Sequence, residues 1–262
     1  MKRISVLMGI YNCADTLPSA LDSLIAQTNK EWKCIMCDDG SVDNTYDVAR
    51  EYVKKYPDLF ILIRNDINKG LNITLNRCLE LADTEYVARM DGDDICDSTR
   101  FKKEIAFLDD NQEYAFVSSW MDMFDENGVF GTIKYSETPS KESFVKGSPF
   151  CHAGCMIKTS AIKSVGGYTE DKKYIRVEDF DLWVKLYSNG FFGYNIQESL
   201  YSMLDDRNAF QRRNIKTRIN ESRVIRKACR ELELNPVYQL YSFIPIIKYF
   251  VPKLIYNYYH KK

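Results

Sequence analysis

Residues 4–12, Ile-Ser-Val-Leu-Met-Gly-Ile-Tyr-Asn, pass from a largely apolar run into a polar tip. Similar apolar runs follow at Trp32–Cys37, Leu59–Ile63 and Tyr86–Met90. The segments between them carry apolar residues at three- and four-residue steps, which predicts helices at Thr16–Gln27, Asp43–Lys55 and Gly70–Ala82. Alternating helices and continuous apolar strands are typical of a parallel sheet covered on both faces. The sequence therefore predicts an α/β fold.

Polar clusters follow three of these strands, at the ends where ligands bind in open α/β sheets. They are Tyr11-Asn12, Asp38-Asp39-Gly40-Ser41 and Asp91-Gly92-Asp93-Asp94. Because the carboxyl ends of parallel strands share one sheet edge, we expect these clusters to lie near one another. The predicted ligand site is at that edge.

The last of these clusters places three carboxylates within four residues. Oxygen ligands suit a hard divalent cation such as Mg²⁺ or Mn²⁺, which commonly completes its shell with phosphate oxygens. Gly92 would allow a tight turn and the close approach of a ligand. The alternative interpretation is an acidic loop in which Asp94 or Asp97 caps the next helix.

Two further acidic pairs allow both a functional and a structural interpretation. Asp38 and Asp39 could accept hydrogen bonds from a base or a ribose, but the same stretch would also serve as a turn and helix cap. Glu178 and Asp179 stand at the start of a predicted helix, Asp179–Asn189. A carboxylate held there could act as a general base, or it could simply cap the helix.

Seven stretches of the chain occur together in the order and approximate spacing of one known family. They are Ser5–Asn12, Ser23–Thr28, Asp38–Asp43, Asn68–Gly70, Met90–Asp94, Gly166–Tyr168 and Glu178–Trp183. Over residues 3–205 the set resembles the family 2 glycosyltransferases of the GT-A fold, which invert the transferred sugar. The resemblance implies a mostly parallel, Rossmann-like sheet flanked by helices, with a C-terminal helical appendage. It also implies an enzyme that uses a nucleotide-diphosphate sugar, a UDP-sugar being favoured.

The resemblance assigns roles to individual positions. Tyr11, Asp39 and Asp91 would bind the donor. Asp91 and Asp93 would form the DxD pair that binds Mn²⁺ or Mg²⁺, with Asp93 the direct ligand and Asp94 in support. Asp179 would be the catalytic base with Glu178 beside it. His152 and Trp183 are expected at an acceptor pocket.

The net charge of −1 conceals an uneven distribution along the chain. Residues 207–262 contain 13 Lys and Arg against three Asp and Glu, so residues 1–206 carry −11. We expect a catalytic domain at 1–206, with a nucleotide-sugar half at about 1–97 and an acceptor half at about 98–206. Residues 207–262 are expected to form a basic helix at Gln211–Leu234 and an aromatic tail.

The tail carries an apolar helical stripe from Leu240 to Tyr258 that prolines and lysines interrupt. Two interpretations stay open: the stripe packs on the catalytic domain, or it anchors the protein in the plane of an anionic membrane surface. No apolar stretch has the roughly 20 residues of a spanning helix, and Met1–Met8 is too short for a signal peptide. The eight cysteines lack a disulfide-framework spacing, which favours reduced thiols in the cytoplasm.

The expected function is transfer of one sugar onto a glycan or lipid-linked acceptor in capsule, O-antigen or other cell-surface polysaccharide synthesis. Two alternatives are a catalytically silent scaffold that binds sugar nucleotides and a polyprenyl-phosphate sugar synthase. The chain lacks the Gly-x-Ser-x-Gly, Gly-x-Gly-x-x-Gly and Walker A motifs of hydrolases, dinucleotide enzymes and P-loop kinases. No nucleic-acid partner is expected.

Overall fold

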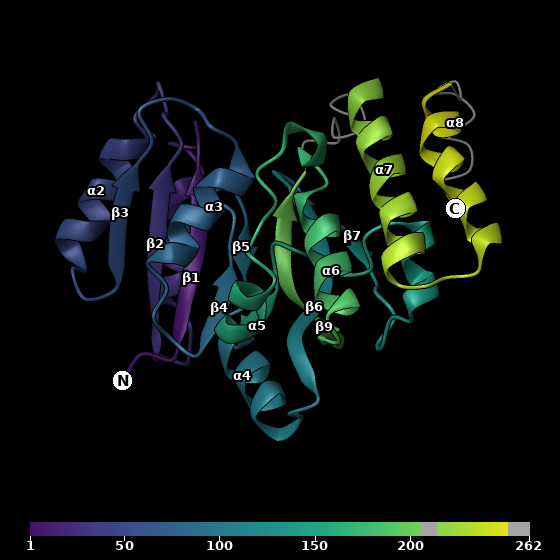
Figure 1. Cartoon of the computed structure of the whole chain (residues 1–262). Coiled ribbons are helices and arrows are strands. Elements are labelled where there is room, and N and C mark those ends of the chain that lie inside the picture. Colours follow the sequence, from purple (N-terminus) through teal and green to yellow (C-terminus); the bar gives the residue numbers. More distant parts are fainter. Residues whose placement is uncertain (206–213, 251–262) are drawn as a thin grey trace.

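The four predicted N-terminal strands form one parallel block in the order β3-β2-β1-β4. The computed structural model describes residues 1–205 and 214–250 of the chain. Its first strands are β1 (Ile4–Ile10), β2 (Trp32–Asp38), β3 (Phe60–Arg64) and β4 (Tyr86–Arg89). Ile4 of β1 lies opposite Trp32 of β2 and Tyr86 of β4, which aligns the strand ends along one edge. Figure 1 shows these strands side by side.

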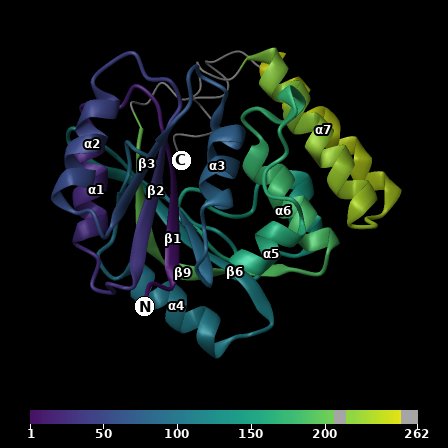
Figure 2. The same cartoon turned by 60° about the vertical axis from the view of Figure 1, so that its left-hand side comes forward.

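Side chains of these strands alternate between two cores, as the strand period of two requires. Val6 and Met8 pack with α1 (Leu17–Ile25), α2 (Thr45–Lys55) and α4 (Arg100–Asp110). Leu7 lies on the other face with α3 (Leu71–Glu80). Figure 2 shows α1 and α2 on one side of the sheet and α3 on the other. The sheet is therefore buried on both faces, which explains its uninterrupted apolar strands.

The second half of the chain extends the same sheet in the order β4-β8-β6-β9-β5. Its strands are β5 (Ile95–Cys96), β6 (Tyr114–Asp125), β7 (Gly128–Ile133), β8 (Met156–Lys158) and β9 (Phe192–Leu204). Of these pairs, only β6 and β9 are parallel, and β7 forms a hairpin with β6. The helical segments here are η1 (Lys141–Lys146), α5 (Thr159–Ser164), η2 (Lys172–Tyr174) and α6 (Glu178–Ser188).

The longest strand, β9, does not follow from the sequence pattern. Its centre, Asn195–Ser199, is largely polar, and the pairing with β6 shifts register next to Trp120. Such bulges break the two-residue alternation by which a strand is recognised. The partner strand β6 explains why this polar segment is nevertheless extended.

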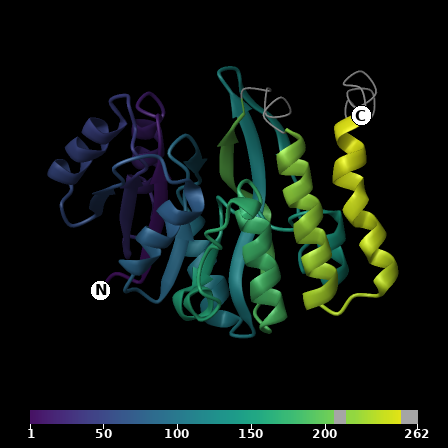
Figure 3. The same ribbon diagram turned by 45° about the horizontal axis from the view of Figure 1, so that its top comes forward.

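The basic helix of the C-terminal region is α7 (Ile215–Glu231), capped by the side chain of Asn214. Residues 211–213 of the predicted helix lie outside the described residues. η4 (Pro236–Phe243) and α8 (Ile244–Phe250) then run back beside α7, as Figures 1 and 3 show. Among the described helices, none is both long and apolar enough to cross a membrane.

Helix α7 shares a hydrophobic core with α6. Val224, Ile225 and Ala228 are buried in the same cluster as Phe180 and Val184 of α6. Lys227 also forms an ion pair of 2.6 Å with the buried Asp181 of α6. The boundary at residue 206 stays a prediction, and α7, which follows it, is packed against α6.

Candidate active site

The acidic loop Asp91–Asp94 is fixed between β4 and the end of β1. A Cβ atom on Gly92 would lie 2.9 Å from Cys13 Sγ and 3.2 Å from Ile10 Cγ2, so only glycine fits without a shift. The Thr16 hydroxyl donates a 3.1 Å hydrogen bond to the Gly92 carbonyl. Gly92 therefore permits close approach of the chain's own β1 end, which is a different reason from the ligand contact expected.

The three carboxylates of the loop have different surroundings. Asp91 is partly exposed and accepts a hydrogen bond from Arg89, while Asp93 is exposed. Asp94 is only 2% exposed and accepts hydrogen bonds from the Tyr201 hydroxyl and the Leu204 amide, both at 2.8 Å. Burial, with the charges of Asp91 and Asp93, raises the pKa of Asp94 to about 8. Asp94 thus ties the loop to β9.

This arrangement fits a divalent cation held by two carboxylates. Within residues 1–205 and 214–250, no three His, Cys, Asp or Glu side chains form a ready-made metal cage. Asp91 and Asp93 are the accessible oxygen donors, and their negative charges, which add to the effect of burial on the pKa of Asp94, would be relieved by a cation. Mg²⁺ and similar ions are often bound by one or two carboxylates together with substrate phosphates.

The predicted nucleoside residues lie at the ends of β1 and β2. The Asp39 carboxylate is buried and accepts hydrogen bonds from the Asn65 side chain and the amides of Lys69 and Gly70 at 2.7–2.9 Å. It therefore fixes the turn that leads into α3, a role that the sequence did not reveal. Tyr11 is 46% exposed at the same edge and is accessible to a ligand.

The two acidic residues predicted to include the general base begin helix α6. Glu178 and Asp179 are its first two residues and both are partly exposed. Burial and the neighbouring charge of Asp179 raise the pKa of Glu178 to about 7. A carboxyl group with a pKa near neutrality is suited to proton transfer.

A buried arginine that the sequence interpretation overlooked holds the acidic loop in place. Arg89 is 2% exposed, and its guanidinium group donates to Asp91 and to the Met90 carbonyl oxygen. The signal was present in the sequence, since a charged residue inside the apolar run Tyr86–Met90 requires a buried partner.

The two residues expected at an acceptor pocket are placed differently. His152 Nε2 lies 2.8 Å from the Tyr168 hydroxyl, and burial, with the Arg89 charge, lowers the pKa of His152 well below its usual value. The imidazole is therefore neutral beside the site. Trp183 is fully buried, stacks on Phe116 and meets His152 edge to face at 6.0 Å. In this structure Trp183 supports His152 from the core.

Comparisons with known proteins agree with this geometry. The family described as Glycosyl transferase family 2 matches residues 5–166. The putative glycosyltransferase EpsE of Bacillus subtilis (strain 168) is 40% identical, over 99% of this chain and 94% of that protein. The UDP-Gal:alpha-D-GlcNAc-diphosphoundecaprenol beta-1,3-galactosyltransferase of Escherichia coli is 34% identical, over 84% of this chain and 80% of that one.

A solved structure shows the same fold. The mannosyltransferase PcManGT from Pyrobaculum calidifontis, in complex with GDP-Man and Mn²⁺, superposes with a TM-score of 0.69. The match covers 94% of this chain and 74% of that one at 16% identity. The expected α/β architecture is thereby confirmed as GT-A. The chain belongs to glycosyl transferase family 2 and is a glycosyltransferase.

Proposed function

We propose that this enzyme transfers one sugar, with inversion, from a UDP-sugar to a glycan attached through a diphosphate to a lipid, in cell-surface polysaccharide synthesis. The observation that carries the proposal is the pair of accessible carboxylates, Asp91 and Asp93, at the edge where the parallel strands end. Arg89 donates a hydrogen bond to Asp91, and the raised pKa of Glu178 suits proton transfer at the start of α6. The galactosyltransferase relative, whose name specifies UDP-Gal and a diphosphoundecaprenol acceptor, supports the substrate classes.

The donor side of the site would be formed by the sheet edge and the acidic loop. The exposed ring of Tyr11 and the β2 end around Asp39 would bind the nucleoside. Asp91 and Asp93 would hold Mn²⁺ or Mg²⁺, with Asp94 fixing the loop through Tyr201. When bound, the cation supplies positive charge against the leaving diphosphate. Arg89 orients Asp91 through a hydrogen bond to its carboxylate.

The acceptor side would be formed by the start of α6. Asp179 would accept the proton of the attacking hydroxyl, with Glu178 at its side. Attack from the face opposite the diphosphate inverts the anomeric centre, so the site needs a base and no covalent nucleophile. Neutral His152 and Tyr168 would line this side of the reacting centre.

The proposal also includes association of the enzyme with a membrane. Val237, Leu240, Phe243, Ile247 and Phe250 are exposed on η4 and α8, and we call these five residues the apolar face. Exposed apolar side chains beside basic ones are typical of interfacial helices. The apolar face would hold the enzyme on the cytoplasmic surface of the membrane. Residues 251–262, the rest of the predicted stripe, lie outside the described residues.

The test is a transfer assay with purified full-length enzyme, Mn²⁺, a panel of UDP-sugars, and GlcNAc linked through diphosphate to a short polyprenol. Release of UDP together with a longer glycolipid of inverted anomeric configuration, assigned by NMR, is expected. Donor binding without turnover would instead identify a silent scaffold. Transfer to polyprenyl monophosphate, surviving Asp179→Asn, would identify a polyprenyl-phosphate sugar synthase, since a phosphate acceptor needs no strong base.

A further inference from the structure

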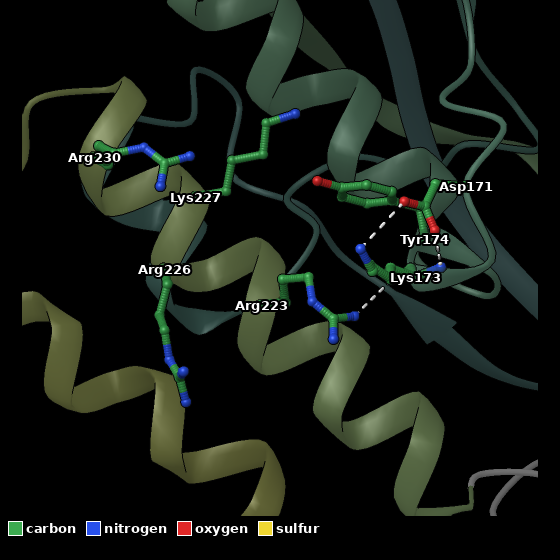
Figure 4. Close-up of a pocket in the computed structure, with 7 residues that line it drawn as sticks. All are labelled: Asp171, Lys173, Tyr174, Arg223, Arg226, Lys227 and Arg230. Atoms are coloured by element: carbon green, nitrogen blue, oxygen red, sulfur yellow. Dashed lines mark hydrogen bonds and ion pairs between the residues drawn. The ribbon is translucent and has the colours of Figure 1, made fainter.

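A basic pocket, whose lining includes no residue of the acidic loop, lies between α7 and η2 (Figure 4). It is a pocket of about 590 Å³. Five of its seven lining residues are cationic and one is acidic: Asp171, Lys173, Tyr174, Arg223, Arg226, Lys227 and Arg230. The donor-side residues of the proposed function contribute nothing to this lining.

The spacing of the basic residues along α7 creates the pocket wall. Arg223, Lys227 and Arg230 follow one another at steps of four and three, so they share one helix face about 10 Å long. Figure 4 shows Arg223 and Lys227 extending from α7 toward the η2 side, and Arg226 pointing toward the neighbouring helical segment. The cations therefore line a concave surface.

Contacts with the catalytic region hold this wall in place. Arg223 donates a 3.1 Å hydrogen bond to the Lys173 carbonyl, and Asn220 donates one of 3.1 Å to the Ile175 carbonyl. The Lys227 ammonium group lies 5.4 Å from the centre of the Tyr174 ring. A phosphate group entering the pocket would meet cations that are already positioned.

Positive charge in the pocket exceeds the negative charge that faces it. Three acids face the five cations: Asp181 pairs with Lys227 at 2.6 Å, Asp171 lies 3.7 Å from Lys173, and Glu231 lies 3.5 Å from Arg230. Among the described residues, Arg223 and Arg226 direct their hydrogen bonds to neutral acceptors: the Lys173 carbonyl, Asn220, Ser222 and Ser242. Guanidinium groups with uncompensated charge suit the several oxygens of a diphosphate.

The pocket lies between the predicted base and the apolar face. On one side, η2 ends at Tyr174, four residues before Glu178 begins α6, and Lys227 is bonded to Asp181 of that helix. On the other side, Arg226 donates to Ser242 and its guanidinium lies 5.7 Å from the ring of Phe243. A ligand here would have its anionic group in the pocket and an apolar chain along η4 and α8.

We propose that this pocket binds the diphosphate of the lipid-linked acceptor. The inference rests on the proposed function, in which the donor diphosphate is bound at the acidic loop and the acceptor carries a second diphosphate. The pocket would position the acceptor so that its sugar hydroxyl reaches Asp179. The lipid chain would leave the site along the apolar face.

The binding test uses the full-length enzyme in EDTA, so that the acidic loop cannot bind diphosphate through a metal. Farnesyl diphosphate and inorganic pyrophosphate are titrated by calorimetry, with farnesol as the uncharged control. Wild type should bind both diphosphates, and Arg223→Ala/Arg230→Ala should bind them about 10- to 100-fold more weakly. The matched control, Arg50→Ala/Lys54→Ala, removes two exposed cations from α2 and should bind like wild type.

Kinetics then separate this inference from the proposed function. In Arg223→Ala/Arg230→Ala, the KM for the diphosphate-linked acceptor should rise by a similar factor, while the KM for the UDP-sugar stays at the wild-type value. Unchanged diphosphate affinity in the variant overturns the inference even if transfer is normal. Diphosphate binding without any transfer by wild type counts against the proposed function. If the variant loses only binding to phosphatidylglycerol vesicles, the pocket serves lipid headgroups and the inference is wrong.

Discussion

Asp93 is the most accessible carboxylate of the acidic loop, and its replacement should separate metal binding from folding. Asp93→Ala should reduce turnover by about 10²-fold or more and remove the dependence on divalent ions, because a cation ligand facing the donor diphosphate is lost. The unfolding midpoint should hardly change at an exposed position. The measurement is UDP release against Mn²⁺ concentration, with the exposed Asp110→Ala as control. Wild-type turnover in Asp93→Ala would refute the assignment.

Asp179 is expected to act in the proton-transfer step alone. Asp179→Asn preserves size and can still cap α6, but it cannot accept a proton, so turnover should fall by about 10²–10⁴-fold. Donor affinity, measured by calorimetry with UDP-sugar and Mn²⁺, should remain near wild type. A collapse of donor affinity with normal turnover of the bound donor would make Asp179 a binding residue.

Glu178 should make stability depend on pH. Its pKa is about 7 in the folded protein and near 4.5 in the unfolded chain, so the folded state binds the extra proton between these values. Stability should therefore fall as pH rises from about 4.5 to 7. Glu178→Gln should remove about 1–2 kcal/mol of that fall, a value reduced for the partial exposure of the side chain. Urea unfolding of both proteins at pH 5 and pH 8 gives the difference, and equal pH dependence would contradict it.

Arg100 connects β4, which leads into the acidic loop, with β8 and α4. This fully buried side chain donates hydrogen bonds to the carbonyls of Arg89 and Cys155, both at 3.0 Å, and to Glu104 at 3.1 Å. It thus joins the ends of β4 and β8 to α4. Burial raises the pKa of Glu104 to about 7 despite the arginine beside it.

Removing that arginine should therefore destabilise the fold. Arg100→Met leaves Glu104 and two carbonyl groups buried without their cation, and should cost about 3–5 kcal/mol of unfolding free energy. Arg100→Met/Glu104→Leu should recover part of the loss, because no unpaired acid remains. Denaturant unfolding followed by circular dichroism checks both variants. A single variant as stable as wild type would show that Arg100 is dispensable.

The elements that could be predicted are those whose apolar pattern is set by burial on both sides. β1 covers residues 4–10, the part of the opening stretch before its polar tip, and β2, β3 and β4 differ from the predicted runs by at most one residue at either end. β9 could not be predicted, because bulges and a polar centre hide its period. The same distinction holds in the site. Motifs identified the carboxylates, but the hydrogen-bond partners of Asp39 and Asp94 come from distant segments and only the fold brings them together.

Across the whole molecule, the C-terminal region has two sides with opposite character. Val224 and Ile225 of α7 are buried against the catalytic region. Leu240 and Ile247 of the apolar face are instead 64% and 60% exposed. Deleting everything after Asn235 would uncover buried parts of α7 as well, so point substitutions test the membrane interpretation more cleanly.

Leu240→Ser/Ile247→Ser should weaken binding to phosphatidylglycerol vesicles by about tenfold or more, since each buried aliphatic side chain contributes about 1.5–3 kcal/mol. High salt should weaken wild-type binding, because Lys248 and the other basic residues of the tail attract the anionic surface. Vesicle sedimentation gives both quantities. The control is Val129→Ser, which removes an equally exposed apolar side chain, 62%, from β7. Equal sedimentation of wild type and the double variant would mean that lipid does not cover the apolar face.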